Sequence, residues 1–243
     1  MEGRRGSGGL QAVEMTRVRL SYVLDGDQPN WPGSPGLRLH DRDRIANGDA
    51  ANTTLIEIYS HYGTHVDAPV HFVPGGASLS DFAIDEFVYE RPVVLDLPLG
   101  ESELITGEML RAHADRIHGH DLVLIRSGHE RLRGDRHRYE HFGPGWSTEG
   151  ARTLRAEFPE VRAVALDWLS LCAVQHVAEG VGAHVELLTA DALGRVVLIY
   201  EDVCLSVLTG LTPSRVYALP LLIDGIDGGP CTIVAELADG DTY

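Results

Sequence analysis

Apolar residues recur along this chain in short runs that are separated by glycine, proline and charged residues. Several runs are rich in β-branched residues and are bounded by turn residues, as buried strands are. They predict strands over residues 18–23, 53–59, 91–97, 121–126, 161–166, 196–200, 216–220 and 232–237. Between these runs the spacing of apolar positions predicts helices over 77–86, 106–117, 147–158 and 176–191. Strands and helices that alternate in this way predict a single domain of the α/β or α+β class.

The length of 243 residues is compatible with one large domain. The first residues are rich in glycine and arginine and contain no apolar stretch of the kind found in signal peptides. We therefore interpret residues 1–14 as a disordered leader or a cloning remnant, with Met15 as the natural start. Residues 15–243 then form the folded domain.

The formal net charge of −16 argues against nucleic acid and anionic membranes as partners. A small molecule is the expected partner instead. The three cysteines, Cys172, Cys204 and Cys231, are widely spaced and form no CxxC pair, which is typical of reduced thiols in a cytoplasmic protein. No apolar run is long enough to predict a transmembrane helix.

The densest group of chemically reactive residues lies between His61 and His71, in the sequence HYGTHVDAPVH. Imidazoles with one carboxylate are a ligand set that suits zinc or manganese. In a straight strand the Cα atoms of His61 and His65 would lie about 13 Å apart, too far for both to bind one ion. Gly63 would permit a bend between them, and Pro69 prevents a helix from continuing through the window. We expect a kinked loop that carries the ligands.

A second group of candidate ligands follows later in the chain. Its members are His176, Glu179, His184, Glu186, Glu201 and Asp202. His184 lies in a predicted helix and Glu201 at the end of a predicted strand, two positions from which side chains can enter one pocket. The segment 127–141 is rich in arginine, glycine and histidine and predicts a mobile surface loop, although its histidines, His129, His137 and His141, could also bind a metal. Trp31 lies among prolines and glycines, where it could form a pocket wall or fill a gap in the core.

The window from His61 to Phe72 resembles the HxGTHxDxPxH signature of the cyclase family, which includes bacterial kynurenine formamidases and isatin hydrolases. The resemblance covers most of the chain from Leu20 onward. Its further supporting segments are similar to the family pattern at 31–35 (WPGSP), 125–128 (IRSG), 142–147 (FGPGWS), 218–221 (ALPL) and 228–230 (GGP). It implies an α/β fold of the swivelling β/α type, with helices around a mixed, partly barrel-like sheet.

The resemblance also implies a site and an activity. His61, His65 and Asp67 would bind one or two Zn²⁺ ions, or Mn²⁺, and His184 and Glu201 would complete a second metal position. The interval between these last two residues is several residues longer than in the family pattern. Trp31 and Phe72 would bind substrate, and the protein would be a homodimer or homotetramer. The implied reaction is hydrolysis of a C–N bond in a small amide or lactam, most simply N-formylkynurenine from tryptophan catabolism.

His71 follows Asp67 by four residues and lies beyond Pro69. We assign it as the proton shuttle of the hydrolysis, first a base toward water and then an acid toward the departing nitrogen. The alternatives are a fourth metal ligand or a hydrogen-bond partner of a ligand. Two other functions also remain open: a lactone hydrolase or natural-product cyclase that uses the same metal site, and a metal-binding or ligand-binding protein without catalysis.

Overall fold

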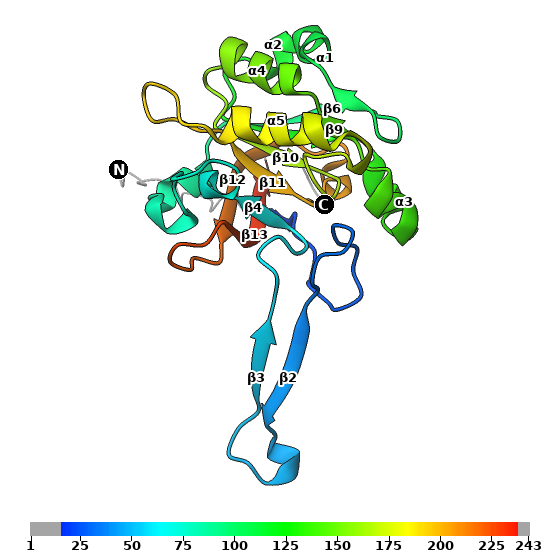
Figure 1. Cartoon of the computed structure of the whole chain (residues 1–243), viewed down its shortest axis with the longest axis vertical. Helices are drawn as coiled ribbons and strands as arrows, with labels where there is room; N and C mark the ends of the chain where they lie inside the picture. The colour runs from blue at the N-terminus through cyan, green and yellow to red at the C-terminus, as the bar shows by residue number, and fades with distance from the viewer. Residues whose placement is uncertain (1–15, 238–243) are drawn as a thin grey trace, which may run out of the picture.

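The computed structural model describes residues 16–237 and is built around one curved sheet (Figure 1). The strands follow the order β5-β12-β13-β4-β11-β10-β8-β6, and β1 pairs with β13 beside this path. Their bounds are β1 Arg17–Arg19, β4 His65–Asp67, β5 Val88–Tyr89, β6 Pro92–Asp96, β8 Leu122–Arg126, β10 Ala163–Leu166, β11 Leu198–Glu201, β12 Pro213–Pro220 and β13 Gly228–Leu237.

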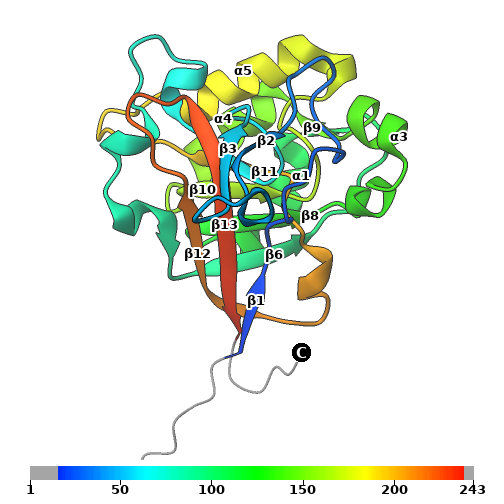
Figure 2. The ribbon, with the colours of Figure 1, turned by 90° about the horizontal axis from the view of Figure 1, so that it is seen from below.

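The sheet is mixed in direction. Strands β6, β8, β10 and β11 run parallel, whereas β4, β13, β12 and β5 are joined by antiparallel pairings. The sheet curls until β12 lies close to β6, so it is nearly closed into a barrel (Figure 2). The predicted α/β class with a mixed, partly barrel-like sheet is therefore confirmed.

Helices cover the outer face of the sheet. They are α1 (Gly107–Ala112), α2 (Ala114–Ile117), α4 (Thr148–Glu157) and α5 (Val177–Leu188), with α3 (Arg136–His141) at one side (Figure 1). The predicted starts of two helices are confirmed, because Thr106 and Ser147 each accept a hydrogen bond from the first turn that follows. Outside the main sheet, β7 (Leu104–Ile105) and β9 (Gly145–Trp146) form a short parallel pair.

Two apolar cores follow from the alternation of side chains along the strands. On β8, Val123 and Ile125 pack under the helices, whereas Leu122 and Leu124 fill the inside of the curved sheet. On β11, Ile199 belongs to the helix side and Tyr200 to the inner side. By the same alternation Glu201 belongs to the side that α5 covers.

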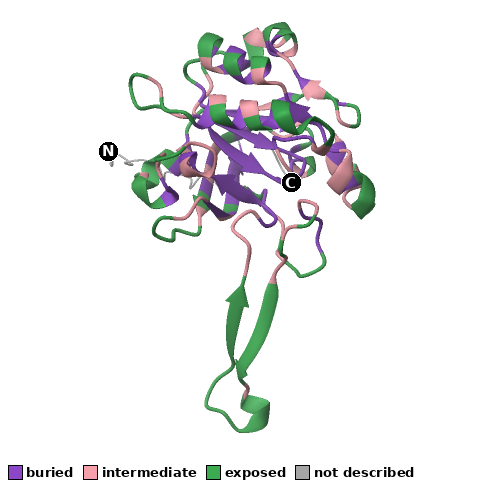
Figure 3. Cartoon of the chain, viewed as in Figure 1, coloured by how far each residue is buried: buried purple, intermediate pink, exposed green. Residues whose placement is uncertain are grey.

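Strands β2 (Arg38–Asp43) and β3 (Thr53–Glu57) form an antiparallel hairpin that projects away from the body (Figure 1). We call residues 38–57 the arm. Every residue of both strands is exposed (Figure 3). The predicted strand over 53–59 is therefore present, but it pairs only with a polar segment that the hydropathy pattern missed.

Two other expectations are wrong. The segment 77–86 is not an α-helix but two short 3₁₀ turns, Leu79–Asp81 and Ile84–Phe87, the first of them capped by Ser78. The segment 127–141 is not a plain surface loop, since it contains a 3₁₀ turn and α3 and buries His129 and Tyr139. The polar sequence of this segment gave no indication that these two side chains are buried.

The remaining expectations concern the termini, the thiols and membranes. The predicted leader, residues 1–14, lies outside the described residues. All three cysteines are unpaired, and Cys172 and Cys231 are buried. Over residues 16–237, none of the helices has the combination of length and apolar sequence needed to cross a bilayer.

Candidate metal centre

Two of the predicted ligand residues, His65 and Asp67, lie on β4, a short strand in the middle of the sheet, rather than in a loop as expected. Val66 points into the inner core, so His65 and Asp67 point to the opposite face, toward α5. Antiparallel pairing places His65 directly across from Glu201 on β11. The predicted bend is present just before the strand, where Gly63 has a φ of 65° that favours glycine. This bend turns His61 back toward Asp67.

Helix α5 contributes His184 to the cluster. Its buried residues recur at helical spacing, and His184 occupies the middle of that buried stripe. The helix approaches closely because Gly180 has no side chain: a Cβ there would lie 2.5 Å from the Cα of Cys172. The nine residues between α5 and β11 form a surface turn stabilised by hydrogen bonds between Asp191 and Arg195. That turn accommodates the longer interval between His184 and Glu201.

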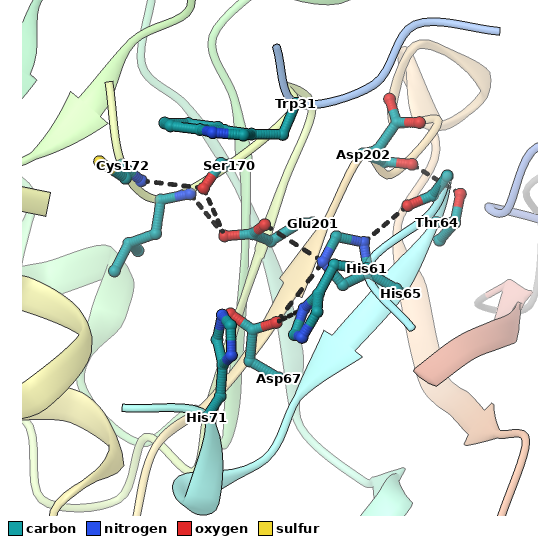
Figure 4. A network of polar contacts seen from close by, with 12 residues as sticks. Trp31, His61, Thr64, His65, Asp67, His71, Ser170, Cys172, Glu201 and Asp202 are labelled. Carbon is teal, nitrogen blue, oxygen red and sulfur yellow. Dashed lines mark hydrogen bonds and ion pairs between the residues drawn. The ribbon is translucent and has the colours of Figure 1, made fainter. Parts of the chain in front are cut away.

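The structure thus brings together five of the predicted site residues, and Figure 4 shows four of them, His61, His65, Asp67 and Glu201. His61 Nδ1 lies 2.8 Å from Asp67 Oδ1. His65 Nε2 lies 3.3 Å from Glu201 Oε2 and 3.5 Å from Asp67 Oδ1. His184 Nε2 lies 3.4 Å from Asp67 Oδ2 and 3.5 Å from Glu201 Oε1. Asp67 therefore lies between all three imidazoles, and all five side chains are nearly or fully buried.

Backbone carbonyl groups set the tautomers of two of these histidines. His65 Nδ1 lies 2.7 Å from the carbonyl oxygen of Gly63, and His184 Nδ1 lies 2.7 Å from that of Gly180. A carbonyl oxygen can only accept, so each Nδ1 carries the proton and donates it. In the neutral ring, each Nε2 then presents a lone pair to the two carboxylates.

Lone pairs that face carboxylates are the arrangement of a cation site. His65 Nε2 and Asp67 Oδ2 are buried and have no hydrogen-bond partner among the described residues. Buried polar groups without partners are costly, and a divalent cation would satisfy both. Two groups have atoms close enough to hold one ion, namely His61, Asp67 and His71, and His65, Asp67 and Glu201. The donor set of imidazole and carboxylate fits zinc or manganese.

Without a cation, the cluster must be neutralised by protons. Burial would lower the pKa of His61, but hydrogen bonds with Asp227 and Asp67 raise it to about 9. Burial would also lower the pKa of His184, but the carboxylates of Asp67 and Glu201 raise that pKa to about 9. Burial also favours a protonated Asp67, yet hydrogen bonds from the histidines hold its pKa well below the usual value.

His71 differs from the other histidines. It lies in a 3₁₀ turn, Pro69–His71, and its ring stacks on His61 with centroids 3.9 Å apart. Burial lowers the pKa of His71 below its usual value, so the ring is neutral at pH 7. A neutral imidazole at the edge of the cluster can accept a proton.

A pocket of about 250 Å³ opens over the cluster. Both residues predicted to bind substrate, Trp31 and Phe72, line it, and Phe72 stacks on the ring of His184 with centroids 4.2 Å apart. The other lining residues are mostly apolar or belong to the cluster: Ser34, Tyr59, His61, Gly63, Asp67, His71, Leu169, Ser170, Cys172, Val177, Val181, His184 and Glu201. Among the described residues, the lining includes no arginine or lysine.

The other candidate ligands lie apart from the cluster. Glu179 accepts a hydrogen bond from the backbone of Thr148, and Glu186 pairs with Arg152. Asp202 is buried but pairs with Arg133, on the far side of Thr64 (Figure 4). His176 is exposed. Of the histidines in 127–141, His129 is buried against Tyr139, and the ring of His137 lies tilted against that of His141 at a centroid distance of 4.8 Å.

Sequence reasoning missed contributors at two places in the chain. Asp227, just before β13, lies 3.0 Å from His61 Nε2 through its Oδ2. Ser170 and the backbone N–H of Leu171 donate to Glu201 Oε1, at 3.2 and 2.6 Å, and hold that carboxylate in place. Neither contact has a local signal in the sequence, because each joins segments that are far apart in the chain.

The fold and the cluster together define an α/β protein with a buried histidine and carboxylate centre suited to a divalent cation. Comparison with known proteins gives the family. Residues 18–171 match the model of the cyclase family, described as a putative cyclase. The chain therefore belongs to the cyclase family.

Individual relatives agree with this family. The chain is 31% identical to cyclase-like protein 1 of Arabidopsis thaliana over 220 residues, covering 87% of this chain and 81% of that protein. It is 25% identical to a kynurenine formamidase of Erythrobacter litoralis over 235 residues, covering 90% and 94%. The structure matches isatin hydrolase A from Labrenzia aggregata with a TM-score of 0.74 and 25% identity, covering 91% and 93%.

Proposed function

We propose that this protein hydrolyses a C–N bond in a small aromatic amide, with an activity of the arylformamidase type. The observation that carries the proposal is the convergence of three imidazoles and two buried carboxylates below an aromatic pocket, with His71 beside them. Relatives named as kynurenine formamidases and isatin hydrolase support it, since both names describe the opening of a C–N bond.

In this proposal His61, His65 and Asp67 would hold a divalent cation, and His184 and Glu201 would help to hold a second one. A bound cation of this kind supplies Lewis-acid polarisation of a carbonyl and lowers the pKa of a water molecule. Ser170 and the backbone of Leu171 fix Glu201, and the carbonyl groups of Gly63 and Gly180 fix the rings of His65 and His184. The protein thus prepares the site before substrate arrives.

His71 moves the proton. Its neutral ring takes a proton from the attacking water and later gives it to the departing nitrogen, which would otherwise leave as an unstable anion. Trp31 and Phe72 hold an aromatic ring of the substrate against the cluster and exclude bulk water. Because these two side chains form aromatic walls, we expect the protein to prefer aryl amides over aliphatic ones.

One observation favours a second candidate, a neutral lactam such as isatin. N-formylkynurenine carries a carboxylate and an ammonium group, and the described part of the pocket offers no arginine or lysine to the carboxylate. An uncharged ring compound needs no such partner. Both candidates use the same cluster and the same proton shuttle.

A substrate panel tests the proposal. Protein stripped of metal and reloaded with Zn²⁺ or Mn²⁺ is assayed on N-formylkynurenine, formanilide, isatin and a small aromatic lactone. We expect hydrolysis of at least one C–N substrate that depends on the added metal. Turnover of the lactone alone would overturn the amide assignment, and full metal occupancy without turnover on any compound would favour a binding protein.

We further propose that the protein assembles as a homodimer or a homotetramer through the arm. The apolar side chains of Leu39, Leu55 and Ile56 on the arm are exposed by 54 to 62%. An isolated two-stranded hairpin is only marginally stable in water, so a partner surface is needed to hold it. A second copy of the chain meets this need by a symmetric exchange of arms.

Three unpaired cysteines support a reducing compartment, and we propose the cytoplasm. Burial raises the pKa of the Cys172 thiol to about 11, so this thiol at the pocket is not a nucleophile at neutral pH. The reaction is therefore assigned to activated water and not to a covalent cysteine intermediate.

A further inference from the structure

Asp227 is a carboxylate that contacts the cluster but was not among the predicted ligands. It lies just before β13, and its carbonyl oxygen accepts a hydrogen bond of 2.9 Å from the backbone N–H of Ala68. The next residue, Gly228, pairs with Asp67 in the β13–β4 ladder. Strand pairing therefore fixes the backbone of Asp227 beside the strand that carries His65 and Asp67.

The side chain of Asp227 contacts two histidines through one oxygen. Its Oδ2 lies 3.0 Å from His61 Nε2 and 3.4 Å from His71 Nδ1. The two rings are stacked, with an interplanar angle of 27°. A carboxylate oxygen placed at the edges of two stacked imidazoles accepts from His61 Nε2, and its charge next to His71 Nδ1 holds the two rings in their orientation relative to one another.

The contact also selects a tautomer. When His61 Nε2 carries the proton and donates to Asp227, the lone pair of the neutral ring is on Nδ1. That nitrogen is the one that faces Asp67, at 2.8 Å. Metal-binding histidines commonly donate their other ring N–H to a carboxylate in this way, which fixes the ring and increases its basicity.

Gly228 completes the cradle of His61. A Cβ at this position would lie 2.6 Å from His61 Cε1 and 2.9 Å from the carbonyl oxygen of Val66. Any side chain here would therefore displace the ring from its place against β13. The pair Asp227 and Gly228 thus determines both the position and the rotation of His61.

We propose that Asp227 is a positioning residue of the metal centre, which holds His61 in the tautomer that presents Nδ1 to the cation and keeps His71 stacked beside it. The proposal rests on the proposed metal site but adds a residue from a distant strand. Its side chain is 44% exposed, so its substitution leaves no buried charge without a partner.

The experiment measures metal affinity and not activity. Metal-free wild type, Asp227→Ala and Asp227→Asn compete for Zn²⁺ with a chromophoric chelator. We expect Asp227→Ala to bind Zn²⁺ about 10- to 100-fold more weakly, the range for lost partners of metal ligands. Asp227→Asn should recover part of this loss, because its amide oxygen can still accept from His61 Nε2.

Asp224→Ala is the matched control. Asp224 lies in the same loop and is exposed, and its carboxylate contacts only Ser80 among the hydrogen bonds of the described residues. It removes the same charge, so we expect its Zn²⁺ affinity to stay within about twofold of wild type. Thermal unfolding of the metal-free variants shows that each is folded before its affinity is compared.

A double-mutant cycle with His61→Ala isolates the contact. In the His61→Ala background, Asp227→Ala should weaken Zn²⁺ binding no further. An unchanged affinity in Asp227→Ala, or an equal loss with and without His61, would overturn the proposal. A weaker affinity in a protein that hydrolyses none of the panel compounds would sustain the positioning role and reject the hydrolase proposal.

Discussion

At the scale of single residues, His71 is the proposed proton shuttle, and we expect turnover to depend most directly on its side chain. His71→Ala should lower kcat by about two to four orders of magnitude, because it removes the group that moves the proton. The zinc content should stay that of wild type, since His65, Asp67, His184 and Glu201 remain. Inductively coupled plasma mass spectrometry and steady-state kinetics on the active panel compound measure the two effects.

The matched control is His137→Ala, because His137 lies in α3 and its ring contacts His141 away from the pocket. Its kcat and metal content should equal those of wild type. A loss of zinc in His71→Ala would instead make His71 a ligand, in keeping with the group of His61, Asp67 and His71 that could hold an ion.

The residue scale is also where the sequence was most informative. In the window from His61 to His71 the local residues predict the local structure. They are a glycine at the bend, a proline after the strand and polar side chains at alternate positions. Asp227 carried no such signal. Its role arises only when β13 pairs with β4, more than a hundred residues away in the chain, and no pattern around Asp227 specifies that register.

At the scale of elements, the position of α5 determines whether His184 reaches the carboxylates. Gly180→Ala should stabilise an isolated helix by about 1 kcal/mol. Here we expect the opposite sign, because the added Cβ would overlap the backbone of Cys172 and push the helix outward. The expected cost is about 1 to 3 kcal/mol in the free energy of unfolding, together with weaker Zn²⁺ binding.

Chemical denaturation and chelator competition measure both quantities. Val185→Ala on the same helix, where the side chain is 39% exposed, should change the free energy of unfolding by much less and leave metal affinity alone. If Gly180→Ala proves more stable than wild type, the close approach of α5 to residue 172 does not control the site.

A second prediction at this scale concerns pH. Asp167 follows β10 and accepts hydrogen bonds from Ser127 and from the backbone of Gly128, which joins the ends of β10 and β8. Burial raises the pKa of Asp167 to about 6, despite these hydrogen bonds. A raised pKa in the folded state means that protonation favours folding, so this contribution is complete below about pH 4 and is lost as the pH rises through 6.

Relative to Asp167→Asn, the free energy of unfolding of wild type should therefore fall by about 2 to 3 kcal/mol between pH 4 and pH 7. Urea denaturation of both proteins across this range measures the difference, and titrations that the two proteins share cancel. A wild type that gains stability over the variant as the pH rises would show that the hydrogen bonds outweigh burial.

The predictions of helices and strands were correct where the hydrophobic periodicity was clear. They were wrong where tertiary contacts determine the local structure. The helices after Thr106 and Ser147 start as predicted, because their capping residues act locally. The segment 77–86 has too few residues and too many polar ones to form a helix without packing. Strand β2 was missed because its sequence, RLHDRD, contains a single apolar residue, and such a strand exists only through its pairing with β3.

At the scale of the whole molecule, the arm is the feature for which we propose a partner. Leu39 and Ile56 form a cross-strand pair on the arm. The double variant Leu39→Glu with Ile56→Lys removes the apolar face but keeps the hairpin, because opposite charges across strands attract. Light scattering after size exclusion should show the wild type as a dimer or tetramer and the double variant as a monomer.

Leu193→Lys provides the control for the arm variant. Leu193 is 76% exposed in the turn between α5 and β11, so this change adds a charge to another surface. Its oligomeric state should equal that of wild type. A wild type that is monomeric at high protein concentration would leave the arm without its proposed role.

The last prediction follows from how the metal centre joins separate parts of the fold. Its proposed ligands come from β4, α5 and β11 and from the segment before β4, so the complete site exists only in the folded chain. A cation that binds the folded state alone stabilises it by about 2.7 kcal/mol at a concentration of 100 times its Kd. For a chain of this size, that corresponds to a rise in Tm of about 5 to 10 °C.

Differential scanning fluorimetry of metal-free protein, with and without Zn²⁺, measures this rise. Glu201→Gln should reduce it, because the variant keeps the shape of the side chain but removes one of the two buried negative charges that a cation neutralises. Glu186→Gln, on the outer face of α5 where Glu186 pairs with Arg152, should show the full rise. Removal of the negative charge of Glu201 must weaken the binding of a cation held next to it. Equal rises in Tm in the two variants would therefore place the stabilising cation outside the cluster around Asp67.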